Sequence, residues 1–486
     1  YLGLDLSTQR LKATLIDQAG TTQLTCDVDF DQELPQYSTK GGCYTDVNRA
    51  FAHPLMWVEA LDLLFFKLAA AAAPQLAQLA AIACCAQQHS SVYWNEKAQH
   101  RLRHLDTNLP LKDQLGDCFS ITDSPIWQDT STGSQCRQLE RQIGGPAKLA
   151  SITGSIAYER FTINQIAKIY QTNPELYQAT PRISLVSSFL TTLLLGDFAP
   201  IDYADGSGMN VLDIRSKEWS PTIVRIVADD SLLHKLGTPA ATQSVISEST
   251  APYWQTKYGI NSACRLLAGT GDNPASVLAL AANPGDAIVS LGTSDTVMFP
   301  CAFPSRNRQE DDNLDGHILC HPLATSTSSD YIALLCFRNG SLTREWVRDQ
   351  YAGGSWSTFA DVLECTPPGL LHHLGFYYLS PEILPRSHGV QRFGLNGGPV
   401  ESSPRNGQQV SAPLKTAPLT PLSEFPDPAW NVRAVVESQA LHMRLYLARK
   451  GLDHPQRIMA LGGASINPAI TQIFADVLNA PVWLAE

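Results

Sequence analysis

Short apolar runs separated by polar turns open the chain. Residues 1–6 are apolar apart from Asp5, residues 7–10 are polar, and residues 11–17 return to an apolar pattern. This spacing predicts a β-hairpin, and a third strand is expected over residues 22–30. The chain is therefore expected to begin as an antiparallel ribbon.

A longer pattern over residues 56–79, rich in Ala and Leu, predicts a helix. Pro74 lies inside this stretch and is expected to split the helix, because proline lacks the backbone N–H donor. The apolar run 81–86 then predicts a buried strand that ends on Gln87–His89. Strands, a helix and a further strand in this order favour an α/β fold.

The central region has a different pattern, with fewer strand-like runs. Residues 146–195 are expected to be mainly helical, and the apolar stretch 182–195 predicts one buried helix. Residues 202–208 are rich in Asp, Gly and Ser and predict a loop. Another helical stretch is expected from Trp219.

The pattern starts afresh near residue 240. An apolar run over residues 264–268 predicts a strand, which leads through a Gly-rich turn into a helix that ends near Ala282. Either Asp272 or Asn273 can serve as the N-cap of that helix. We therefore expect a strand, a tight turn and a helix around these two residues.

A second hairpin is predicted over residues 286–299, around the turn Gly292–Ser294. Its first strand ends in a small, hydroxyl-rich turn, as does the strand at residues 1–6. This similarity predicts an internally duplicated fold. We expect an N-terminal domain over residues 1–240 and a C-terminal domain over residues 241–486.

The C-terminal region begins with a polar segment and ends in regular elements. Residues 389–428 are rich in Pro, Gly and Ser and predict a surface insertion. A helix is expected over residues 430–450. Residues 457–461, 467–478 and 481–485 then predict a strand, a helix and a strand, which together form a βαβ unit.

Composition narrows the class of protein. The 486 residues include 35 Lys and Arg against 46 Asp and Glu, a formal net charge of −11, and 44% are hydrophobic. This excludes a disordered or collagen-like chain and favours two or more globular domains. The acidic balance argues against nucleic acid as a partner, and no apolar run is long enough to span a membrane. The 11 cysteines contain no C-x-x-C motif, which favours reduced core thiols in the cytoplasm over disulfides or a zinc site.

The sequence contains neither of the two common glycine-rich nucleotide motifs, G-x-x-x-x-G-K-[ST] and G-x-G-x-x-G. Three turns at strand ends are the alternative: Thr8–Gln9, Gly292–Thr293 and Gly462–Gly463. Their backbone N–H groups and hydroxyls suit phosphate oxygens. Each turn taken alone equally fits an ordinary connection between elements.

Two carboxylates stand at the ends of predicted strands. Asp5 lies inside an apolar strand, where a buried lone carboxylate is costly. We expect it to face a cleft, either as a ligand of Mg²⁺ and its waters or as an acceptor for the neighbouring turn. Asp272 follows a Gly-rich turn and precedes a helix. It suits either a general base that takes a hydroxyl proton or the cap of that helix.

Other polar residues offer the donors and acceptors that a polyol or sugar requires. Gln88, His89 and Arg160 are of this kind. His89 equally fits a core histidine, and Arg160 a structural pair with Glu159. Trp356 suits either a platform for a base or core packing. The residue types alone leave these alternatives open.

Taken in order, these segments resemble the FGGY family of carbohydrate kinases, and within it the eukaryotic-type branch that phosphorylates xylulose. The resemblance covers almost the whole chain. It is carried by Leu4–Gln9, Gln87–His89, Trp127–Thr132, Ala157–Thr162, Asn164–Lys168, Ile201–Asn210, Thr270–Ser276, Ser290–Thr296, Phe337–Leu342 and Gly462–Ser465.

The resemblance implies a duplicated, actin-like (ribonuclease-H-like) α/β fold with two domains around a cleft. Sugar would bind mainly to the N-terminal domain and ATP mainly to the C-terminal one. The implied reaction transfers the ATP γ-phosphate to the 5-hydroxyl of D-xylulose, which feeds the pentose phosphate pathway. The implied cofactor is Mg²⁺, and the implied partners are D-xylulose and ATP, with no nucleic acid and no membrane.

The resemblance also implies roles for single residues. Asp272 is implied as the general base, and Asp5 as the residue that orients Mg²⁺ through water. The implied sugar ligands are His89, Arg160, Asp272, Asn273 and Gln88. The implied ATP or phosphate ligands are Thr8, Gln9, Gly292, Thr293, Trp356, Gly462, Gly463 and Asn467. Asp129 lies in a sugar-loop motif of the family, but Ser131 stands where many members carry Arg, which argues against direct contact by Asp129.

The chain departs from the family pattern in two places. Residues 389–428 form a longer segment than the family core needs. The chain also stops where the family usually adds an Ala- and Gly-rich helix, so the second domain is expected to lack its last helix. Ribulose, glycerol or gluconate are alternative substrates. A catalytically silent sugar sensor or an actin-like ATPase is the alternative from another class, and we expect a monomer or a homodimer.

Overall fold

A computed structural model of the chain describes residues 1–302, 314–323, 330–395 and 419–484. The chain divides into two compact units. Unit 1 comprises Tyr1–Ala281 and Cys301–Ile332, and unit 2 comprises Ala282–Pro300 and Ala333–Glu486. Each unit is built around a mixed sheet, as an α/β fold requires.

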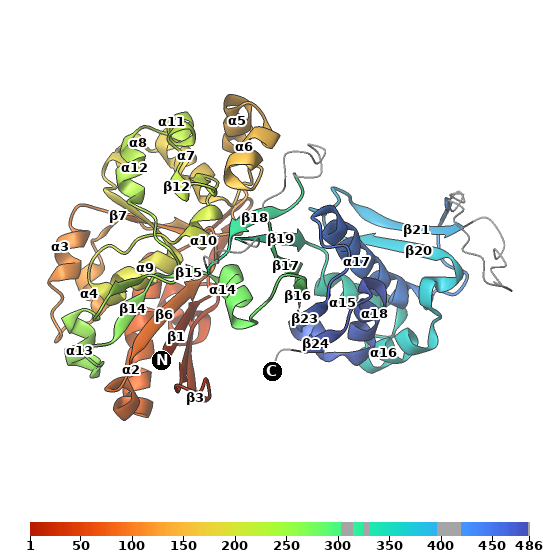
Figure 1. Cartoon of the computed structure of the whole chain (residues 1–486), viewed down its shortest axis with the longest axis horizontal. Helices are drawn as coiled ribbons and strands as arrows, with labels where there is room; N and C mark the ends of the chain where they lie inside the picture. Colours follow the sequence, from red (N-terminus) through yellow and green to blue (C-terminus); the bar gives the residue numbers. More distant parts are fainter. Residues whose placement is uncertain (303–313, 324–329, 396–418, 485–486) are drawn as a thin grey trace. The chain divides into compact units, whose positions relative to one another are not determined.

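The main sheet of unit 1 has the strand order β13-β14-β6-β1-β2-β3, and β15 also pairs with β6. β1 runs antiparallel to β2 and parallel to β6, and β1 and β6 lie side by side in Figure 1. Leu2, Leu4 and Leu6 on β1 are buried, as the apolar pattern predicts for a strand with one face in the core. The strands of this sheet are β1 (Leu2–Leu6), β2 (Arg10–Ile16), β3 (Thr22–Asp29), β6 (Ala81–Ala86), β13 (Val245–Ser247), β14 (Arg265–Leu267) and β15 (Thr270–Gly271).

Helices pack against this sheet. α2 (Pro54–Leu76) contacts β2 and β3. Its backbone is non-helical at Ala72 (φ −146°, ψ 35°), just before Pro74, so the predicted split is confirmed as a kink. Further helices are α1 (Phe30–Glu33), α3 (Ala98–Arg103), α4 (Leu111–Leu115), α5 (Gly133–Ile143), α6 (Pro146–Thr153), α7 (Thr162–Thr172), α8 (Pro174–Gln178), α9 (Val186–Leu195), α10 (Tyr203–Ser207), α11 (Pro221–Val227), α12 (Ser231–Leu236), α13 (Pro252–Tyr258) and α14 (Asp272–Ala279).

Short strands complete unit 1. Two of them, β10 and β7, pair antiparallel to each other. The short strands are β4 (Tyr44–Asp46), β5 (Arg49–Ala52), β7 (Ser91–Trp94), β8 (Phe119–Ile121), β9 (Ser124–Pro125), β10 (Arg182–Leu185), β11 (Leu212–Asp213), β12 (Glu218–Trp219) and β18 (His317–Cys320).

Three predictions for the central region are wrong. Residues 182–195 do not form one helix, because their first part pairs with β7 as strand β10 before α9 begins. Residues 202–208 are not a loop but contain α10, since Asp202 caps a helical turn by accepting from the Asp205 backbone N at 3.0 Å. Trp219 lies in strand β12, and the helix expected there, α11, begins only at Pro221.

Unit 2 repeats the arrangement around the first hairpin. The strands assigned to unit 2 follow the order β19-β17-β16-β23-β24. β16 runs antiparallel to β17 and parallel to β23, as β1 does to β2 and β6. This shared topology confirms the internal duplication expected from the two hairpins. The strands are β16 (Asp286–Leu291), β17 (Asp295–Cys301), β19 (Tyr331–Phe337), β23 (Arg457–Leu461) and β24 (Val482–Leu484).

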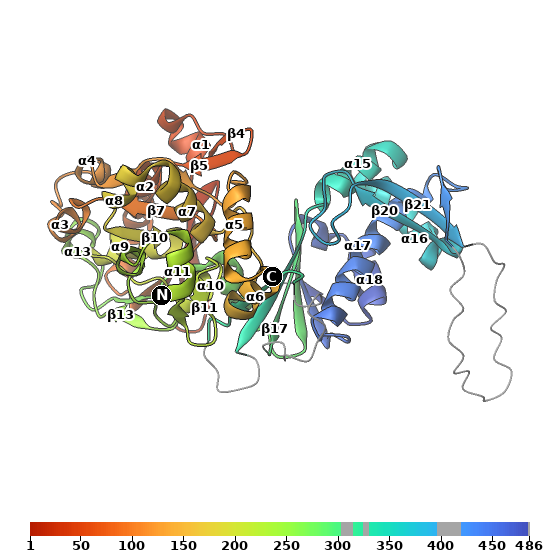
Figure 2. The same ribbon diagram turned by 90° about the horizontal axis from the view of Figure 1, so that it is seen from above.

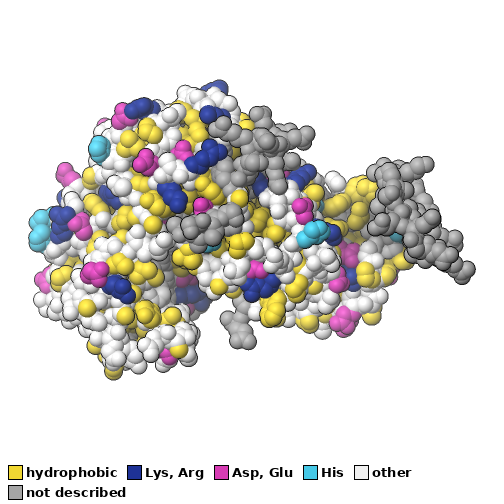
Figure 3. Space-filling model, in the orientation of Figure 1, with side chains coloured by type: hydrophobic (Ala, Val, Ile, Leu, Met, Phe, Trp, Pro, Cys, Tyr) yellow, Lys and Arg dark blue, Asp and Glu magenta, His cyan; other side chains and the backbone are white. Residues whose placement is uncertain are grey.

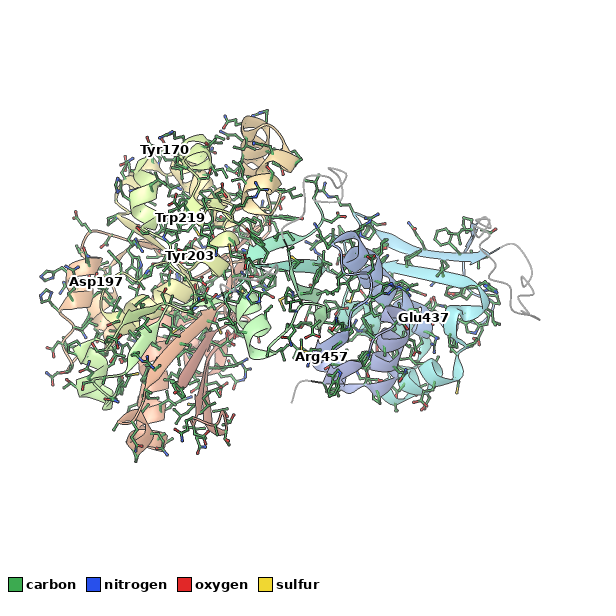
Figure 4. All side chains as sticks on the ribbon, in the orientation of Figure 1. Tyr170, Asp197, Tyr203, Trp219, Glu437 and Arg457 are labelled. Atoms are coloured by element: carbon green, nitrogen blue, oxygen red, sulfur yellow. The ribbon has the colours of Figure 1, made fainter. Side chains whose placement is uncertain are left out.

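Helices α17 (Trp430–Arg449) and α18 (Pro468–Leu478) lie side by side in unit 2, as Figure 1 and Figure 2 show. α15 (Ser341–Tyr351) and α16 (Trp356–Cys365) also pack against α17. Within α17, Arg433 donates to Glu437, labelled in Figure 4, at 2.6 Å. A second sheet is antiparallel and consists of β20 (His373–Tyr378), β21 (Gly389–Leu395) and β22 (Leu419–Leu422).

Two expected boundaries differ from the structure. The chain divides after Ala281 rather than near residue 240, because β14 and β15 pair with β6 of the first sheet. Asp272 therefore belongs to unit 1. The predicted insertion 389–428 contributes β21 and β22 to a regular sheet, and its residues 396–418 lie outside the described part of the chain.

The described residues include no helix that is both long and apolar enough to cross a bilayer. On the face drawn in Figure 3, Lys and Arg side chains lie scattered, several of them beside Asp or Glu. This distribution matches the mixed, acidic composition of the sequence.

Candidate active site

Three strand ends in unit 1 bring together the residues predicted to bind sugar and to take part in catalysis. Asp5 on β1 lies opposite Cys85 of the parallel strand β6, and Thr270 of β15 lies opposite Cys85 on the other side. The carboxyl ends of parallel strands lie at one edge of a sheet. Asp5, the run Gln87–His89 after β6 and Asp272 after β15 therefore meet at the same edge.

Asp272 is the first residue of α14. The predicted N-cap role of Asp272 or Asn273 is wrong, since the cap is Gly271 and no side chain caps the helix. Asp272 Oδ1 accepts from the Asn273 backbone N at 2.8 Å and from Asn273 Nδ2 at 3.2 Å. Burial, and next the charge of Asp5, raises the pKa of Asp272 to about 7. A carboxyl group with this pKa can take a proton from a hydroxyl near neutral pH.

Asp5 keeps one carboxylate oxygen without a partner. Its Oδ2 accepts from Ser7 Oγ at 3.3 Å, and Lys12 Nζ lies 3.8 Å from the same oxygen. Its Oδ1 is buried, and no hydrogen bond to it occurs among the described residues. The described residues hold no cluster of three or more His, Cys, Asp or Glu that could bind a metal. The Asp5 side chain as a whole is 35% exposed, and a single, partly exposed carboxylate fits a Mg²⁺ ion that keeps its waters and takes other ligands from phosphates.

His89 presents a hydrogen-bond acceptor. Its Nδ1 lies 2.9 Å from the carbonyl oxygen of Gly208. Since a carbonyl only accepts, Nδ1 carries the ring proton. Burial, and next the charge of Arg160, lowers the pKa of His89 to about 3, so the ring is neutral. Nε2 therefore has a free lone pair that suits a hydroxyl donor.

Arg160 contacts a histidine that the sequence did not point to. Arg160 Nη2 lies 2.8 Å from His317 Nε2. A guanidinium group only donates, so this nitrogen accepts and the ring proton is on Nδ1, which lies 3.2 Å from Ser155 Oγ. The guanidinium also lies over the rings of Tyr158 at 5.1 Å and Phe161 at 5.6 Å. These contacts hold the charged head of Arg160 in one orientation.

Two further polar residues of the sequence motifs form hydrogen bonds with buried groups of unit 1. Gln88 is 3% exposed, donates Nε2 to Asp205 Oδ1 at 3.3 Å and accepts from Asn273 Nδ2 at 3.0 Å. Asp129 is 4% exposed and accepts from the Ala50 backbone N at 3.1 Å and from Gln165 Nε2 at 2.8 Å. Both residues therefore have internal partners, and the expectation that Asp129 makes no direct sugar contact fits its surroundings.

The Thr8–Gln9 turn is fixed by side chains of unit 1. Thr8 Oγ1 donates to Gln87 Oε1 at 3.3 Å and accepts from Trp127 Nε1 at 2.9 Å. Gly42 has φ +76°, and a Cβ there would lie 2.0 Å from the Thr8 carbonyl oxygen. Only glycine therefore allows this close approach to the turn.

The Gly292–Thr293 turn of unit 2 rests on a buried ion pair. Asp295 and Arg344 are fully buried and form two hydrogen bonds, at 2.8 and 3.0 Å. Arg344 Nη2 also donates to the Gly292 carbonyl oxygen at 3.5 Å. Burial raises the pKa of Asp295, and the charge of Arg344 opposes this rise. A Cβ at Gly340 would lie 2.7 Å from the Gly292 carbonyl oxygen and 2.8 Å from that of Thr293, so the turn is closely backed.

The other predicted ATP ligands also belong to unit 2. Gly462 has φ +85° and lies against the end of β16, where a Cβ would be 2.6 Å from a backbone oxygen, whereas a Cβ at Gly463 would meet open space. Asn467 caps α18 by accepting from two backbone N–H groups. Trp356 begins α16, is 40% exposed and lies 4.7 Å below the Arg348 guanidinium. An exposed indole is free to contact a ligand.

Four charged or polar residues of this region were missed from the sequence. Lys12 could have been found, because the register of the first hairpin places it directly opposite Asp5. Asp205 lies in a motif segment, but nothing local shows that it is buried. Arg344 and His317 carry no local signal, since Arg344 and Asp295 are 49 residues apart and His317 and Arg160 are 157 apart.

Comparisons with known proteins give consistent matches. Residues 119–279 match the model for the N-terminal domain of the FGGY family of carbohydrate kinases, and residues 399–486 match the model for its C-terminal domain. Xylulose kinase of Mus musculus is 40% identical over 491 residues, covering 100% of this chain and 82% of the relative. Xylulose kinase 2 of Arabidopsis thaliana is 40% identical over 494 residues, covering 100% of this chain and 84% of the relative.

Solved structures support the fold. A xylulose kinase from Rhodospirillum rubrum superposes with a TM-score of 0.77 at 16% identity, covering 99% of this chain and 86% of that chain. A kinase from Brucella ovis, described as a xyloylose kinase, gives a TM-score of 0.75 at 20% identity, covering 100% and 86%. The predicted duplicated, actin-like α/β fold is thereby confirmed.

Proposed function

Because this chain belongs to the FGGY family of carbohydrate kinases, we propose that it transfers the γ-phosphate of ATP to the 5-hydroxyl of D-xylulose. The products are D-xylulose 5-phosphate and ADP. The observation that carries the proposal is the edge of the unit 1 sheet, where Asp272 has a pKa of about 7 and lies beside Asn273. Full-length relatives named xylulose kinases support the choice of sugar.

The sugar is recognised by groups of unit 1. His89 offers Nε2 as an acceptor for a hydroxyl, because its other nitrogen is bound to Gly208. Arg160 offers guanidinium donors to hydroxyl or carbonyl oxygens. Asn273 lies next to the reacting hydroxyl, beside the base. A ketose with several hydroxyls satisfies both donors and acceptors in this set.

The reaction needs positioning, a base and charge compensation. Asp272 takes the proton of the attacking hydroxyl as the new O–P bond forms, and ADP leaves with the former bridging oxygen. The Thr8–Gln9 turn of unit 1 and the Gly292–Thr293 turn of unit 2 each carry N–H and hydroxyl donors that suit phosphate oxygens. Asp5, whose side chain is 35% exposed, would hold Mg²⁺ through water. When bound, the ion neutralises charge on the β- and γ-phosphates.

The adenosine part of ATP is assigned to unit 2. Trp356 presents an exposed ring for contact with the base. Gly462 turns the backbone closely against β16, Gly463 leaves open space in which a nucleotide can approach the backbone, and Asn467 caps the helix that follows. The same turn region therefore provides both close approach and a helix N-terminus.

The direct test compares the wild-type protein with Asp272→Ala on a panel of D-xylulose, ribulose, glycerol and gluconate. ADP release coupled to sugar phosphate formation is measured for each. We expect D-xylulose to give the highest kcat/KM and Asp272→Ala to abolish most of the sugar-dependent turnover. Near wild-type turnover by the mutant would refute the base assignment.

The same panel separates the alternative functions. A higher kcat/KM for another polyol would change the substrate but keep the kinase. Tight xylulose binding without ADP release would indicate a sugar sensor. ATP hydrolysis that no sugar changes would indicate an ATPase of the same fold.

A further inference from the structure

A chain of hydrogen bonds runs from a buried acid to the proposed base. Asp205 Oδ1 accepts from Gln88 Nε2 at 3.3 Å, and Gln88 Oε1 accepts from Asn273 Nδ2 at 3.0 Å. The same Asn273 Nδ2 donates to Asp272 Oδ1 at 3.2 Å. Hydrogen bonds thus link four side chains in series, from α10 through the end of β6 to the start of α14.

The side-chain amide of Asn273 donates hydrogen bonds only to groups of the protein. A side-chain amide nitrogen carries two hydrogens. One goes to Gln88 and the other to Asp272, so both are used within the protein. The carbonyl oxygen of Asn273 is then the part of the amide left for a ligand, and it accepts a hydrogen bond only from a donor such as a hydroxyl.

Gln88 is held in place by close packing. It is 3% exposed. Gly271 passes over it so closely that a Cβ there would lie 2.6 Å from Gln88 Cγ and 2.7 Å from Asp205 Oδ1. The backbone of Gly271 is extended (φ −71°, ψ 155°) and is open to any residue. Glycine is therefore needed at this position for space and not for its backbone angles.

Asp205 is anchored as firmly. It is 1% exposed, and its Oδ2 accepts from Ser187 Oγ at 2.6 Å. Its helix, α10, is capped by Asp202 and packs under Trp219, since a Cβ at Gly206 would lie 3.2 Å from that ring. Figure 4 labels Tyr203, the first residue of α10, and Trp219 in this part of unit 1.

We propose that Gln88 and Asp205 are positioning residues for the proposed kinase reaction. They fix the amide of Asn273 with its oxygen free for a sugar hydroxyl, and through that amide they hold the carboxylate of Asp272. This inference rests on the proposed function of Asp272 as the base. It also changes the expected role of Gln88, whose amide acts on Asn273 and not on the sugar.

Several ionisable groups surround Asp272. Asp5 on β1 and Asp205 on α10 are acidic neighbours, and Cys85 on β6 interacts with Asp5 and with Asp272 itself. Gln88 is a neutral dipole between Asp205 and Asp272 in this group. A negative charge at position 88 would disfavour a second negative charge on Asp272 and raise its pKa.

The first test is Gln88→Met, which keeps the length of the side chain but removes both hydrogen bonds. We expect kcat/KM for D-xylulose to fall ~10–100-fold, through a higher KM and a lower kcat, because the base and the amide lose their orientation. The KM for ATP is expected to stay at the wild-type value, and the thermal midpoint is expected to fall no further than in the matched control, because each variant loses buried hydrogen bonds. Gln135→Met is the matched control, since Gln135 is also buried in unit 1 and donates to Gln171 at 2.8 Å, away from the site.

The second test is Gln88→Glu, whose carboxylate still accepts a hydrogen bond from Asn273. This variant tests the positioning role if Gln88→Met fails to fold. We expect the acidic limb of the kcat/KM profile for D-xylulose to move about one pH unit upward. An unchanged profile in this variant, or wild-type kcat/KM in Gln88→Met, overturns the positioning role. Asp272→Ala is assayed in parallel: if it loses activity while the Gln88 variants do not, the base assignment stands and only the positioning role fails.

Discussion

Aspartates lie at equivalent sheets of the two units, but their neighbours differ. In unit 1, Asp5 has a buried oxygen without a hydrogen-bond partner among the described residues, and Asp272 has a pKa raised to about 7. In unit 2, Asp295 forms two hydrogen bonds with the fully buried Arg344. The surrounding topology is the same, with a hairpin joined to a parallel strand in each unit.

The difference shows what a buried carboxylate can do in this fold. At Asp295, burial raises the pKa and the charge of Arg344 opposes this rise, and the paired carboxylate supports the Gly292–Thr293 turn. At Asp272, burial and the negative charge of Asp5 act together to raise the pKa to about 7, which suits acid–base chemistry near neutral pH. The presence or absence of an arginine partner, and not the residue type, therefore separates the proposed catalytic aspartate from the structural one.

The largest expected effect is on turnover in unit 1. Asp272→Asn should lower kcat for sugar phosphorylation by ~10²–10⁴-fold, because a carboxamide cannot take the hydroxyl proton. The free energy of unfolding should not fall, since the substitution removes a charge that burial disfavours. Steady-state kinetics and urea denaturation of the same preparation measure both. A kcat equal to that of the wild type would remove Asp272 from the mechanism.

The next effect is on stability in unit 2. Arg344→Met leaves Asp295 buried without its cation and should destabilise the protein by about 3–5 kcal/mol. Arg225→Met is the control, because its pair with Asp230 is exposed and should contribute less than about 1 kcal/mol. Denaturant titration followed by circular dichroism checks both variants. Equal losses in the two would show that the buried pair is no more important than a surface pair.

A smaller change in kcat/KM is expected when the pH is lowered. The carboxylate form of Asp272 is the base, and the fold raises the pKa of this group to about 7. Its active form is therefore lost as pH falls through 7, and kcat/KM should drop about tenfold between pH 8 and pH 6. The stability contribution has the opposite sign: the raised pKa favours the protonated fold, and this stabilisation is lost as pH rises toward 7. A flat kcat/KM profile over this range would contradict the assignment.

The smallest effect is expected at the exposed indole of unit 2. Trp356→Leu should raise the KM for ATP about 2–5-fold, through loss of contact worth about 0.5–1 kcal/mol. The KM for D-xylulose should not change, because the sugar groups belong to unit 1. Initial rates at varied ATP and saturating sugar measure the effect. A change in sugar KM instead would contradict the division of ligands between the units.

Local patterns predicted much of the fold. The runs that form β1, β6, β16 and β23 were found at or within one residue of their observed bounds, since alternation and flanking turns are local properties. Residues 182–185 were misassigned because their strand partner, β7, lies far away in the sequence. The helix α10 was missed because its cap, Asp202, stands in a segment rich in turn residues.

The sequence by itself determined the α/β class, the duplicated hairpins and the set of polar residues at strand ends, including Asp5, His89 and Asp272. Only the tertiary structure decided which of the acidic groups are paired. Gln88 and Asp205 are 117 residues apart, and Asp295 and Arg344 are 49 apart. The protonation and orientation of a side chain depend on the neighbours that folding brings to it, and those neighbours are not adjacent in the chain.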